Sequence, residues 1–421
     1  MFFKNSNKRQ GYLAAGLLMC VLSSLFYCYE YFLRVAPSVM QAELMRSYQL
    51  SPAGLGRLIA YYYFAYVPLQ IPVGILLDRY GPHKILTLAC ACCAFGTYIF
   101  SSTNILLLAR VGRFLVGFGS AFAYVGVLKI ANMWLPRRYF AMVAGICTAL
   151  GMFGAMSGEI VMAKLVEING WRAAMSGSAL IGVLLTVAIW WVIQDKSNKK
   201  QYPIYTTFEL LQEIFKIIKS PQLLYAGFIG LCMFLPLTIF AEFWAVPFYE
   251  ALGYSKANAA LASGIVFFGV GVGGPFWGRV SDIVQSRRKP MLIGSLGGSL
   301  CAIPILLLNP LPYFLSLLLL FSLGFFISAQ VLIFAIGNDL SRPSVSSTTV
   351  ACLNFMVMLG GFIVQPLVGW LLEVIMHYNY NATSIAQVND FSQALALMPA
   401  ALMLSTLIVK YLLKESYWSG D

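Results

Sequence analysis

Long apolar runs recur along the whole chain and are separated by short polar segments. A helix that crosses the hydrocarbon core of a bilayer needs about 20 mainly apolar residues. Of the 421 residues, 60% are hydrophobic and only 10% are charged, whereas about 25% are charged in an ordinary soluble domain. The mean hydropathy is +0.78 over the whole length, so the apolar residues do not belong to one anchor. We therefore predict an all-α integral membrane protein, because helices satisfy their own backbone hydrogen bonds in lipid.

Charged and Pro/Gly-rich points divide the sequence into twelve candidate transmembrane helices, six in each half. The first six cover residues 11–36, 54–77, 85–102, 105–128, 139–163 and 172–193, and the second six cover 222–249, 258–280, 290–308, 313–337, 346–372 and 392–414. This pattern predicts an N-terminal half of residues 1–193 and a C-terminal half of residues 222–421. Between them, residues 194–221 alternate apolar and charged residues at helical spacing, which predicts an amphipathic cytoplasmic linker; a solvated loop is the alternative.

The net charge of +12 comes from basic residues that lie in short clusters between the apolar runs. Such clusters are typical of cytoplasmic loops, whereas nucleic-acid binding needs one continuous basic surface. The distribution predicts that both termini lie in the cytoplasm and that the membrane is a bacterial inner membrane. The nine cysteines lie almost wholly inside apolar runs and lack the spacing of metal ligands, so we expect no metal site.

A short motif occurs once in each half. Gly74 and Asp78, in GILLDRYGPHK, recur 204 residues later as Gly278 and Asp282, in GRVSDIVQSRRKP. Both copies follow the second span of their half and precede basic residues. This repeat predicts two six-helix halves of the same orientation, related by an axis along the membrane normal.

The first copy resembles the cytoplasmic signature of the major facilitator superfamily, in which a Gly, an Asp-Arg pair and a second Gly precede basic residues. Arg113-Phe-Leu-Val-Gly117-Phe-Gly119 in the fourth span resembles a second motif of that family, and Gly170-Trp171-Arg172 opens the sixth span as the family does. The resemblance covers the whole chain. It implies the major facilitator fold, with twelve helices in two pseudo-symmetric halves, and transport by alternating access.

The resemblance also implies a role for the repeated motif. A conformational latch would be formed on the cytoplasmic side by the motif residues of both halves, which are Gly74, Asp78, Arg79, Gly81 and Asp282. In the fifth span, GMFGAMSG places small residues where helices can approach closely. Drug exporters of the family carry Gly-Pro there, whereas this chain has Gly154-Ala155, which favours uptake over drug efflux.

Charged side chains inside the spans are few, and each costs about 2.5 to 3.5 kcal/mol or more at mid-membrane unless it is paired or hydrated. They are therefore the first candidates for substrate binding or coupling: Glu30, Arg34, Arg113, Lys129, Glu159 and Glu242. Glu30, Arg113, Glu159 and Glu242 fall at similar depth and could form one layer.

A purely structural role is the alternative for these charges. Glu30 and Arg34 are four residues apart and could pair within their helix, and Arg113 could pair with Glu159. Glu242 has no evident partner in its own helix, where it lies among aromatic residues. A carboxyl group in apolar surroundings can exchange a proton near neutral pH, so Glu242 is the preferred proton-coupling or amine-binding group.

Uncharged polar residues in the spans extend the list of candidates. Tyr62 and Tyr66 share a helix face with Tyr63 and could offer hydroxyls to a solute, although belts of interfacial aromatics are the alternative. Gln330 and Asn354 could hydrogen-bond a solute from the other half or could hold helices together.

These features predict a proton-coupled uptake carrier for a small polar solute, with protons as the coupling ion and no other cofactor. Charges of both signs suit a zwitterion such as an amino acid. YEYFLRVAPSVM, LQIPVGILLDRYG and LGMFGAMSGE also resemble metabolite carriers of intracellular gamma-proteobacteria, among them phagosomal amino-acid transporters.

Two alternatives stay open. One is transport of an organic anion, including a carboxylate siderophore, bound by Arg34, Arg113 and Lys129. The other is a transport-inactive membrane receptor. The sequence carries neither a Walker loop nor a nucleophile with a base partner, so we expect no enzyme activity. We expect a monomer in the lipid bilayer, without nucleic-acid partners.

Overall fold

The structure, a computed structural model, describes residues 2–136, 139–195, 219–341, 346–380 and 386–416. Within these ranges the regular elements are all helices, and no strand occurs. The all-α prediction is confirmed. The expected amphipathic linker at 194–221 falls mainly on residues outside the described ranges.

We call the helices up to residue 192 the N-half and those from residue 221 the C-half. The N-half contains α1 (Phe2–Val35), η1 (Ala36–Met40), α2 (Gln41–Tyr48), α3 (Pro52–Leu69), α4 (Val73–Tyr80), α5 (Pro82–Ser102), α6 (Leu106–Ser120), α7 (Ala123–Trp134) and α8 (Phe140–Val192). The C-half contains α10 (Pro221–Leu235), η3 (Pro236–Trp244), α11 (Ala245–Ala251), α12 (Lys256–Val284), α13 (Arg288–Leu307), α14 (Tyr313–Ile327), η4 (Ser328–Val331), α15 (Leu332–Leu340), α16 (Ser346–Tyr380), α17 (Val388–Ala394) and α18 (Leu397–Tyr411).

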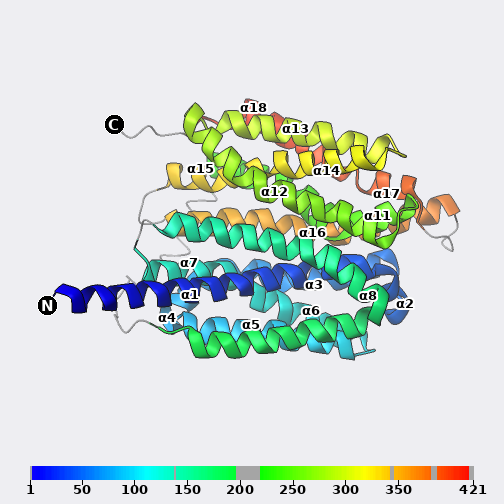
Figure 1. Cartoon of the computed structure of the whole chain (residues 1–421). Coiled ribbons are helices and arrows are strands. Elements are labelled where there is room, and N and C mark those ends of the chain that lie inside the picture. Colours follow the sequence, from blue (N-terminus) through cyan, green and yellow to red (C-terminus); the bar gives the residue numbers. More distant parts are fainter. Residues whose placement is uncertain (1, 137–138, 196–218, 342–345, 381–385, 417–421) are drawn as a thin grey trace.

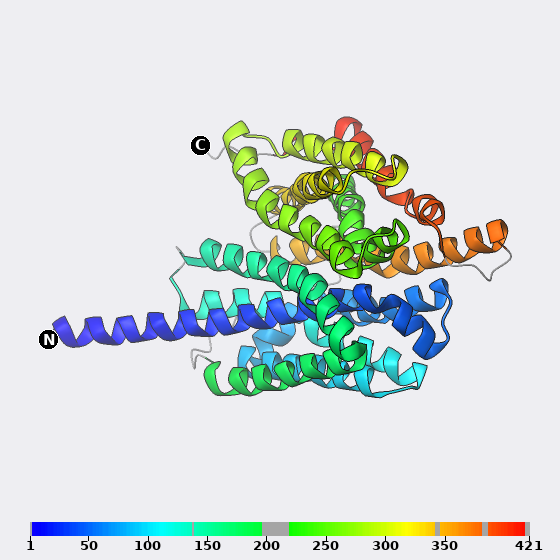
Figure 2. The same ribbon diagram turned by 45° about the vertical axis from the view of Figure 1, so that its right-hand side comes forward.

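The described residues include ten helical segments that are long and apolar enough to cross a membrane. Helix α8 is one of them, yet it turns back on itself at Gly170, whose φ of +76° is open to glycine but strained for other residues. Figure 2 shows its two legs running in opposite directions. Helices α3 and α4 lie outside the ten and together follow the length of the bundle (Figure 1). With α8 counted as two crossings and α3 with α4 added as one, the described helices are consistent with twelve crossings.

Several helices extend beyond the predicted spans. Helix α1 begins at Phe2 rather than at residue 11, and α16 continues to Tyr380 rather than ending at residue 372. The predicted ends were placed at polar residues, but the backbone hydrogen bonds of a helix continue past the hydrocarbon boundary. The apolar pattern therefore marks the lipid-crossing part of each helix and not its full length.

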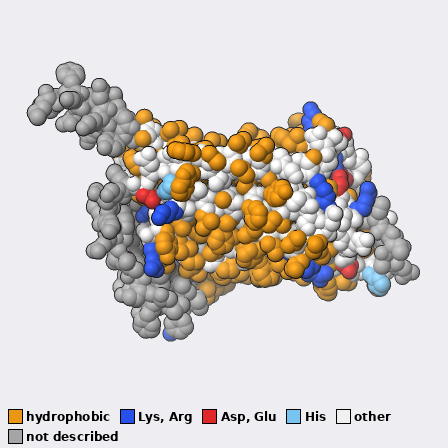
Figure 3. Space-filling view, turned by 90° about the horizontal axis from the view of Figure 1, so that it is seen from below, with side chains coloured by type: hydrophobic (Ala, Val, Ile, Leu, Met, Phe, Trp, Pro, Cys, Tyr) orange, Lys and Arg blue, Asp and Glu red, His pale blue; other side chains and the backbone are white. Residues whose placement is uncertain are grey.

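Apolar side chains cover the middle of the molecular surface. In Figure 3 they form a broad band, and the charged side chains gather toward its two ends. The exposed residues include Leu107, Trp191 and Phe95, each more than half exposed. Such a band greatly exceeds the apolar patches that monomeric soluble proteins leave in water, so it is the lipid-facing surface.

The two halves lie side by side, and both chain ends lie at the same end of the bundle (Figure 1). We call this the terminal end and the other the opposite end. Helix α3 of the N-half packs along α16, and α8 packs along α12. Three polar contacts join the halves near the opposite end: Gln41 Nε2 donates to the Phe243 carbonyl at 2.5 Å, Lys256 Nζ pairs with Glu43 Oε1 at 2.6 Å, and Ala53 N donates to Glu373 Oε2 at 3.2 Å.

Helix α1 packs closely against the first leg of α8, as the small residues of GMFGAMSG predict. A Cβ atom at Gly154 would lie only 2.1 Å from the Cys28 carbonyl oxygen, and one at Gly158 would lie 2.5 Å from Val35. The predicted close approach is confirmed. It brings Glu159, the next residue, against the end of α1.

Candidate functional site

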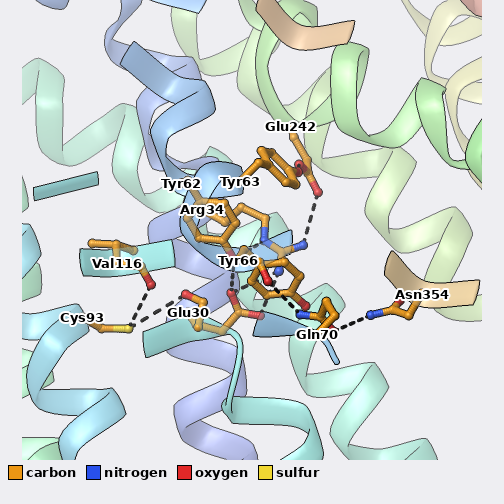
Figure 4. A network of polar contacts seen from close by, with 11 residues as sticks. Glu30, Arg34, Tyr62, Tyr63, Tyr66, Gln70, Cys93, Val116, Glu242 and Asn354 are labelled. Carbon is orange, nitrogen blue, oxygen red and sulfur yellow. Dashed lines mark hydrogen bonds and ion pairs between the residues drawn. The ribbon is translucent and has the colours of Figure 1, made fainter. Parts of the chain in front are cut away.

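Six buried residues from both halves form a polar group in the middle of the bundle, which we call the central cluster (Figure 4). Its members are Glu30 and Arg34 of α1, Tyr62, Tyr63 and Tyr66 of α3, and Glu242 of η3. The exposed fraction is 0% for Glu30, 3% for Arg34 and 2% for Glu242. The three tyrosines lie 10 to 14 residues from the start of α3, which places them roughly 15 to 21 Å from the opposite end.

Within the N-half, Glu30, Arg34 and Tyr62 form a closed triangle. Arg34 Nη2 lies 3.3 Å from Glu30 Oε1, and Arg34 Nε donates to the Tyr62 hydroxyl at 2.9 Å. That hydroxyl donates in turn to Glu30 Oε2 at 3.0 Å. The pairing considered from the spacing of Glu30 and Arg34 therefore exists, but the pair is buried and includes a hydroxyl from a second helix.

Glu242 connects this triangle to the C-half. Its Oε2 accepts a short hydrogen bond from the Tyr63 hydroxyl, and its Oε1 lies 3.7 Å from Arg34 Nη1. The latter distance is too long for a hydrogen bond. Among the described residues, neither Arg34 Nη1 nor Glu242 Oε1 has a hydrogen-bond partner. A donor and an acceptor thus face each other, both buried and both unsatisfied.

Glu242 lies in a stretch of π-helix, Pro236–Trp244. A π-turn interrupts the regular α-helical ladder and occurs often at functional sites. Pro236 begins this stretch and cannot donate a backbone hydrogen bond.

Three tyrosine rings surround the Arg34 guanidinium group. Its Cζ lies 4.2 Å from the ring centre of Tyr31, 5.1 Å from that of Tyr62 and 5.0 Å from that of Tyr66. Contacts between a cation and an aromatic face gain strength where water is excluded. The rings therefore help to hold a positive charge in the middle of the bundle.

Arg113 of α6 reaches the same region but does not pair with Glu159, so that alternative was wrong. Arg113 Nη1 donates to the Leu33 carbonyl at 3.1 Å. This carbonyl would normally accept from the residue four positions later, which is Pro37 and has no N–H. Because Pro37 leaves the Leu33 carbonyl free, this carbonyl can accept from Arg113. An argument from opposite charges alone did not consider such an acceptor. Arg113 Cζ also lies 5.4 Å from the Tyr62 ring centre, and its Nε is buried without a hydrogen-bond partner in the described part of the chain.

Glu159 lies apart from these contacts. Its Oε2 accepts from the Ser38 hydroxyl of η1 at 2.7 Å, and the side chain is fully buried. The layer of four charges expected from the sequence is therefore divided: Glu30, Arg113 and Glu242 surround Tyr62 and Tyr63, whereas Glu159 lies beside η1.

The uncharged candidates lie closer to the terminal end. Asn354 Nδ2 donates to Gln70 Oε1 across the two halves at 2.6 Å, and Gln70 Nε2 donates to the Tyr66 carbonyl at 3.4 Å (Figure 4). Gln330 is half-buried in η4.

Lys129 is half-buried in α7, 16 residues after Arg113 and hence about 24 Å farther along the span. The structure therefore does not bring Lys129 next to Arg113.

The repeated motifs end helices at the terminal end. Gly81 has a φ of +79°, and a Cβ atom there would lie within 2.4 Å of the Asp195 carboxylate. Arg79 is exposed, Gly74 has open space around its Cα, and the side chain of Asp78 is outside what the structure describes. In the second copy, Arg287 joins Asp282 at 2.9 Å and Asp339 at 3.1 Å, which ties the end of α12 to α15.

Several contact residues were missed as candidates from the sequence. Tyr63 was noted only for sharing a face with Tyr62 and Tyr66, yet it donates to Glu242. Ser38 and Gln70 were not considered, although Pro37, directly after the first predicted span, was a signal that polar groups near it could serve as ligands. No group of His, Cys, Asp and Glu among the described residues has the arrangement of a metal site.

Comparison with known proteins concerns the family and the fold. Residues 14–365 match the sequence profile of the family described as Major Facilitator Superfamily. The uncharacterized transporter YybO of Bacillus subtilis is 29% identical over 172 residues, which is 41% of this chain and 40% of that protein. The probable galactarate/D-glucarate transporter GarP of Escherichia coli is 26% identical over 42% of this chain and 40% of its own length. The chain thus spans 40% of the length of these curated relatives.

A longer match joins the chain to the probable sulfoacetate transporter SauU of Cupriavidus necator, which is 23% identical over 67% of this chain and 69% of that protein. Among solved structures, a bacterial homologue of the human lysosomal transporter Spinster, in an inward-facing and unoccupied conformation, has a TM-score of 0.76. The two are 15% identical, and the match covers 97% of this chain and 99% of the other. At this identity, the likeness concerns the fold.

Proposed function

The chain belongs to the Major Facilitator Superfamily, and on this premise we propose that it is a proton-coupled secondary transporter of a small organic acid. The observation that carries the proposal is the relation between Arg34 Nη1 and Glu242 Oε1, which approach to 3.7 Å without a hydrogen bond. A substrate carboxylate and Glu242 compete for the same guanidinium group, and this competition couples the substrate to a proton.

The coupling follows from the charges of the central cluster. Arg34 lies between two carboxyl groups, Glu30 and Glu242. When both are ionised, the guanidinium is neutralised and a further anion is repelled. When a proton binds Glu242 Oε1, one negative charge disappears and Arg34 Nη1 becomes available to a substrate carboxylate. Loss of this proton restores the competition and expels the substrate.

The names of the relatives support the substrate class. Galactarate, D-glucarate and sulfoacetate are small anions that carry two acidic groups each. Arg34 and Arg113 each retain a buried nitrogen without a hydrogen-bond partner in the described part of the chain. Two guanidinium groups that flank the Tyr62 ring suit an anion with two acidic groups.

A zwitterion such as an amino acid is the second candidate. The observation in its favour is the pair of carboxyl groups, Glu30 and Glu242, which lie on either side of Arg34 and could hold an ammonium group. A substrate carboxylate would take the place of the Glu242 carboxylate beside Arg34. A substrate ammonium group would take the place of the Arg34 guanidinium between the two carboxyl groups.

Alternating access would use the separation of the two halves. The three contacts at the opposite end would break in the other state, while the latch residues Gly74, Asp78, Arg79, Gly81 and Asp282 would close the terminal end. In this proposal the protein works as a monomer in the bacterial inner membrane with both termini in the cytoplasm, and the opposite end faces outward. The position of both ends at one side of the bundle agrees with a common side for the two termini, and the basic clusters of the sequence support the cytoplasm as that side.

Uptake into proteoliposomes tests the proposal. A panel of labelled dicarboxylates, sugar acids and amino acids is offered with and without an inward proton gradient. We expect a sugar acid or dicarboxylate to accumulate only with the gradient, and Arg34→Gln to abolish accumulation. Arg46→Gln, which changes an exposed arginine of α2, is the matched control and should transport normally. Selective accumulation of amino acids would favour the second candidate, and gradient-independent uptake would contradict proton coupling.

A further inference from the structure

Glu159 is a buried carboxyl group outside the central cluster, and no cationic side chain among the described residues pairs with it. Its exposed fraction is 0%, Oε2 accepts from Ser38, and Oε1 has no hydrogen-bond partner among the residues that the structure describes. An ionised carboxylate in apolar surroundings without a cation is far less favourable than the neutral acid. Glu159 therefore carries a proton in this conformation.

The carboxyl group lies where three elements meet. Ser38 belongs to η1 and Glu159 to α8, and Ser263 belongs to α12 of the other half, next to Gly264, which faces the residues on either side of Glu159. Ser263 Oγ already donates to the Ala241 carbonyl at 2.6 Å, so its lone pairs remain free to accept. A proton on Glu159 Oε1 would be donated to Ser263 Oγ once the two side chains come within hydrogen-bond distance, which would satisfy the acid and join the two halves.

The neighbouring residues show that this place is part of the contact between the halves. A Cβ atom at Gly264, next to Ser263, would lie 3.3 Å from the side chains of Ile160 and Met156. Helix α8 packs along α12 over this region. If the halves separate at the opposite end, Glu159 loses Ser263 and meets water.

We propose that Glu159 is a proton-binding site that links the pH on the side of the opposite end to closure of that end. This inference rests on the proposed alternation of the two halves but not on the substrate or on coupling at Glu242. On opening, the O–H bond of Glu159 breaks and its proton passes to bulk water. On closing, a proton returns from the same water. Glu159 thus carries no net proton across the membrane, and it makes acid pH favour the closed state.

The charged groups around Glu159 do not reverse this effect. Helix α1 brings Glu30 and Arg34, which pair with each other, η3 brings Glu242, and η1 brings no titratable group. Helix α12 contributes Lys256, which forms an ion pair with Glu43.

Distance measurement between spin labels tests the inference without substrate or gradient. The labels are placed at Ser47→Cys in α2 and Ala257→Cys in α12, both exposed positions at the opposite end of different halves. The half-buried Cys28 and Cys92 are replaced by Ser. As the pH is raised from about 5.5 to 8, the ratio of open to closed protein should rise by up to tenfold per pH unit. This interval lies above the pH range in which a hydrated Glu ordinarily loses its proton.

Glu159→Gln should remove this dependence and leave the end closed at every pH, because the amide can accept from Ser38 and donate to Ser263. Glu167→Gln, at an exposed position of α8, should keep the wild-type slope. A flat wild-type response, or an unchanged slope in E159Q, would overturn the inference. If E159Q does not fold, Ser263→Ala should shift the opening to lower pH, and no shift would overturn it equally. Failure of the uptake experiments alone would leave these distances unaffected.

Discussion

Arg34 of α1 and Glu242 of η3 lie on different halves of the molecule, and their Nη1 and Oε1 atoms are 3.7 Å apart without a hydrogen bond. Arg34 is held within the N-half by Glu30 and Tyr62, whereas Glu242 of the C-half accepts from Tyr63, which also belongs to the N-half. A ligand can therefore displace Glu242 Oε1 from Arg34 Nη1 without breaking the bonds that hold Arg34 within the N-half. Four predictions follow from this arrangement and from the helix contacts around it.

Replacing Glu242 by Gln keeps the shape of the side chain but removes its titration. Gradient-driven accumulation should fall at least about tenfold, equivalent to about 1.4 kcal/mol, which is less than the usual effect of removing one member of a buried charge pair. Exchange of labelled for unlabelled substrate across the membrane should persist, because exchange needs no net proton movement. Glu167→Gln is the matched control, and equal accumulation by E242Q and wild type would refute coupling at this residue.

Removal of the Tyr63 hydroxyl should weaken transport without abolishing it. Tyr63→Phe deprives Glu242 Oε2 of its donor, and a hydrogen bond to a charged group contributes about 1.5 to 3 kcal/mol. We expect the initial uptake rate at limiting substrate to drop about tenfold, which corresponds to a loss of about 1.4 kcal/mol of binding free energy. Tyr98→Phe, at a residue 55% exposed on α5, removes a hydroxyl of the same kind outside the cluster and should have no effect. An unchanged rate in Tyr63→Phe would show that this hydrogen bond does not contribute.

Pro37, which follows α1, should affect substrate binding through Arg113. Pro37→Ala supplies an N–H that can donate to the Leu33 carbonyl and compete with Arg113 Nη1. If this competition removes about 1 kcal/mol from the interaction that orients Arg113, substrate binding should weaken roughly fivefold. The dissociation constant, measured by substrate-induced thermal stabilisation, checks this expectation. Pro275→Ala, inside α12, is the control, and equal changes in both variants would indicate a general effect of proline removal.

Close packing between α1 and α8 should make Gly154 intolerant of any side chain. A Cβ atom would lie 2.1 Å from the Cys28 carbonyl oxygen, so Gly154→Ala must push the two helices apart. We expect a destabilisation of about 1 to 3 kcal/mol, as for other overpacked sites, seen as a lower unfolding temperature in detergent. Gly177→Ala, where no atom lies within 4 Å of the added carbon, should unfold at or above the wild-type temperature. Similar unfolding temperatures for both variants would contradict the packing argument.

The sequence predicted the class of fold because that class depends on local properties. The length and apolar content of each run are sufficient for a helix in lipid, and the repeat of Gly74 and Asp78 indicated two related halves. The i,i+4 spacing of Glu30 and Arg34 allowed their pairing to be considered, since neighbours on one helix face are fixed by helical geometry. Helix ends were less well predicted, because helices continue beyond the lipid boundary.

The partners of the buried charges were decided by the tertiary structure alone. Glu242 meets Tyr63 and Arg34 only because η3 lies against α3 and α1, and these two residues are 179 and 208 positions away in the chain. Arg113 selected a backbone carbonyl released by Pro37 instead of the carboxylate of Glu159, a choice that opposite charge alone could not predict. Sequence determined which residues carry charge into the membrane, through the cost of burying each one. Packing of the two halves determined which charges meet, because contact between distant helices depends on the shape of every surface between them.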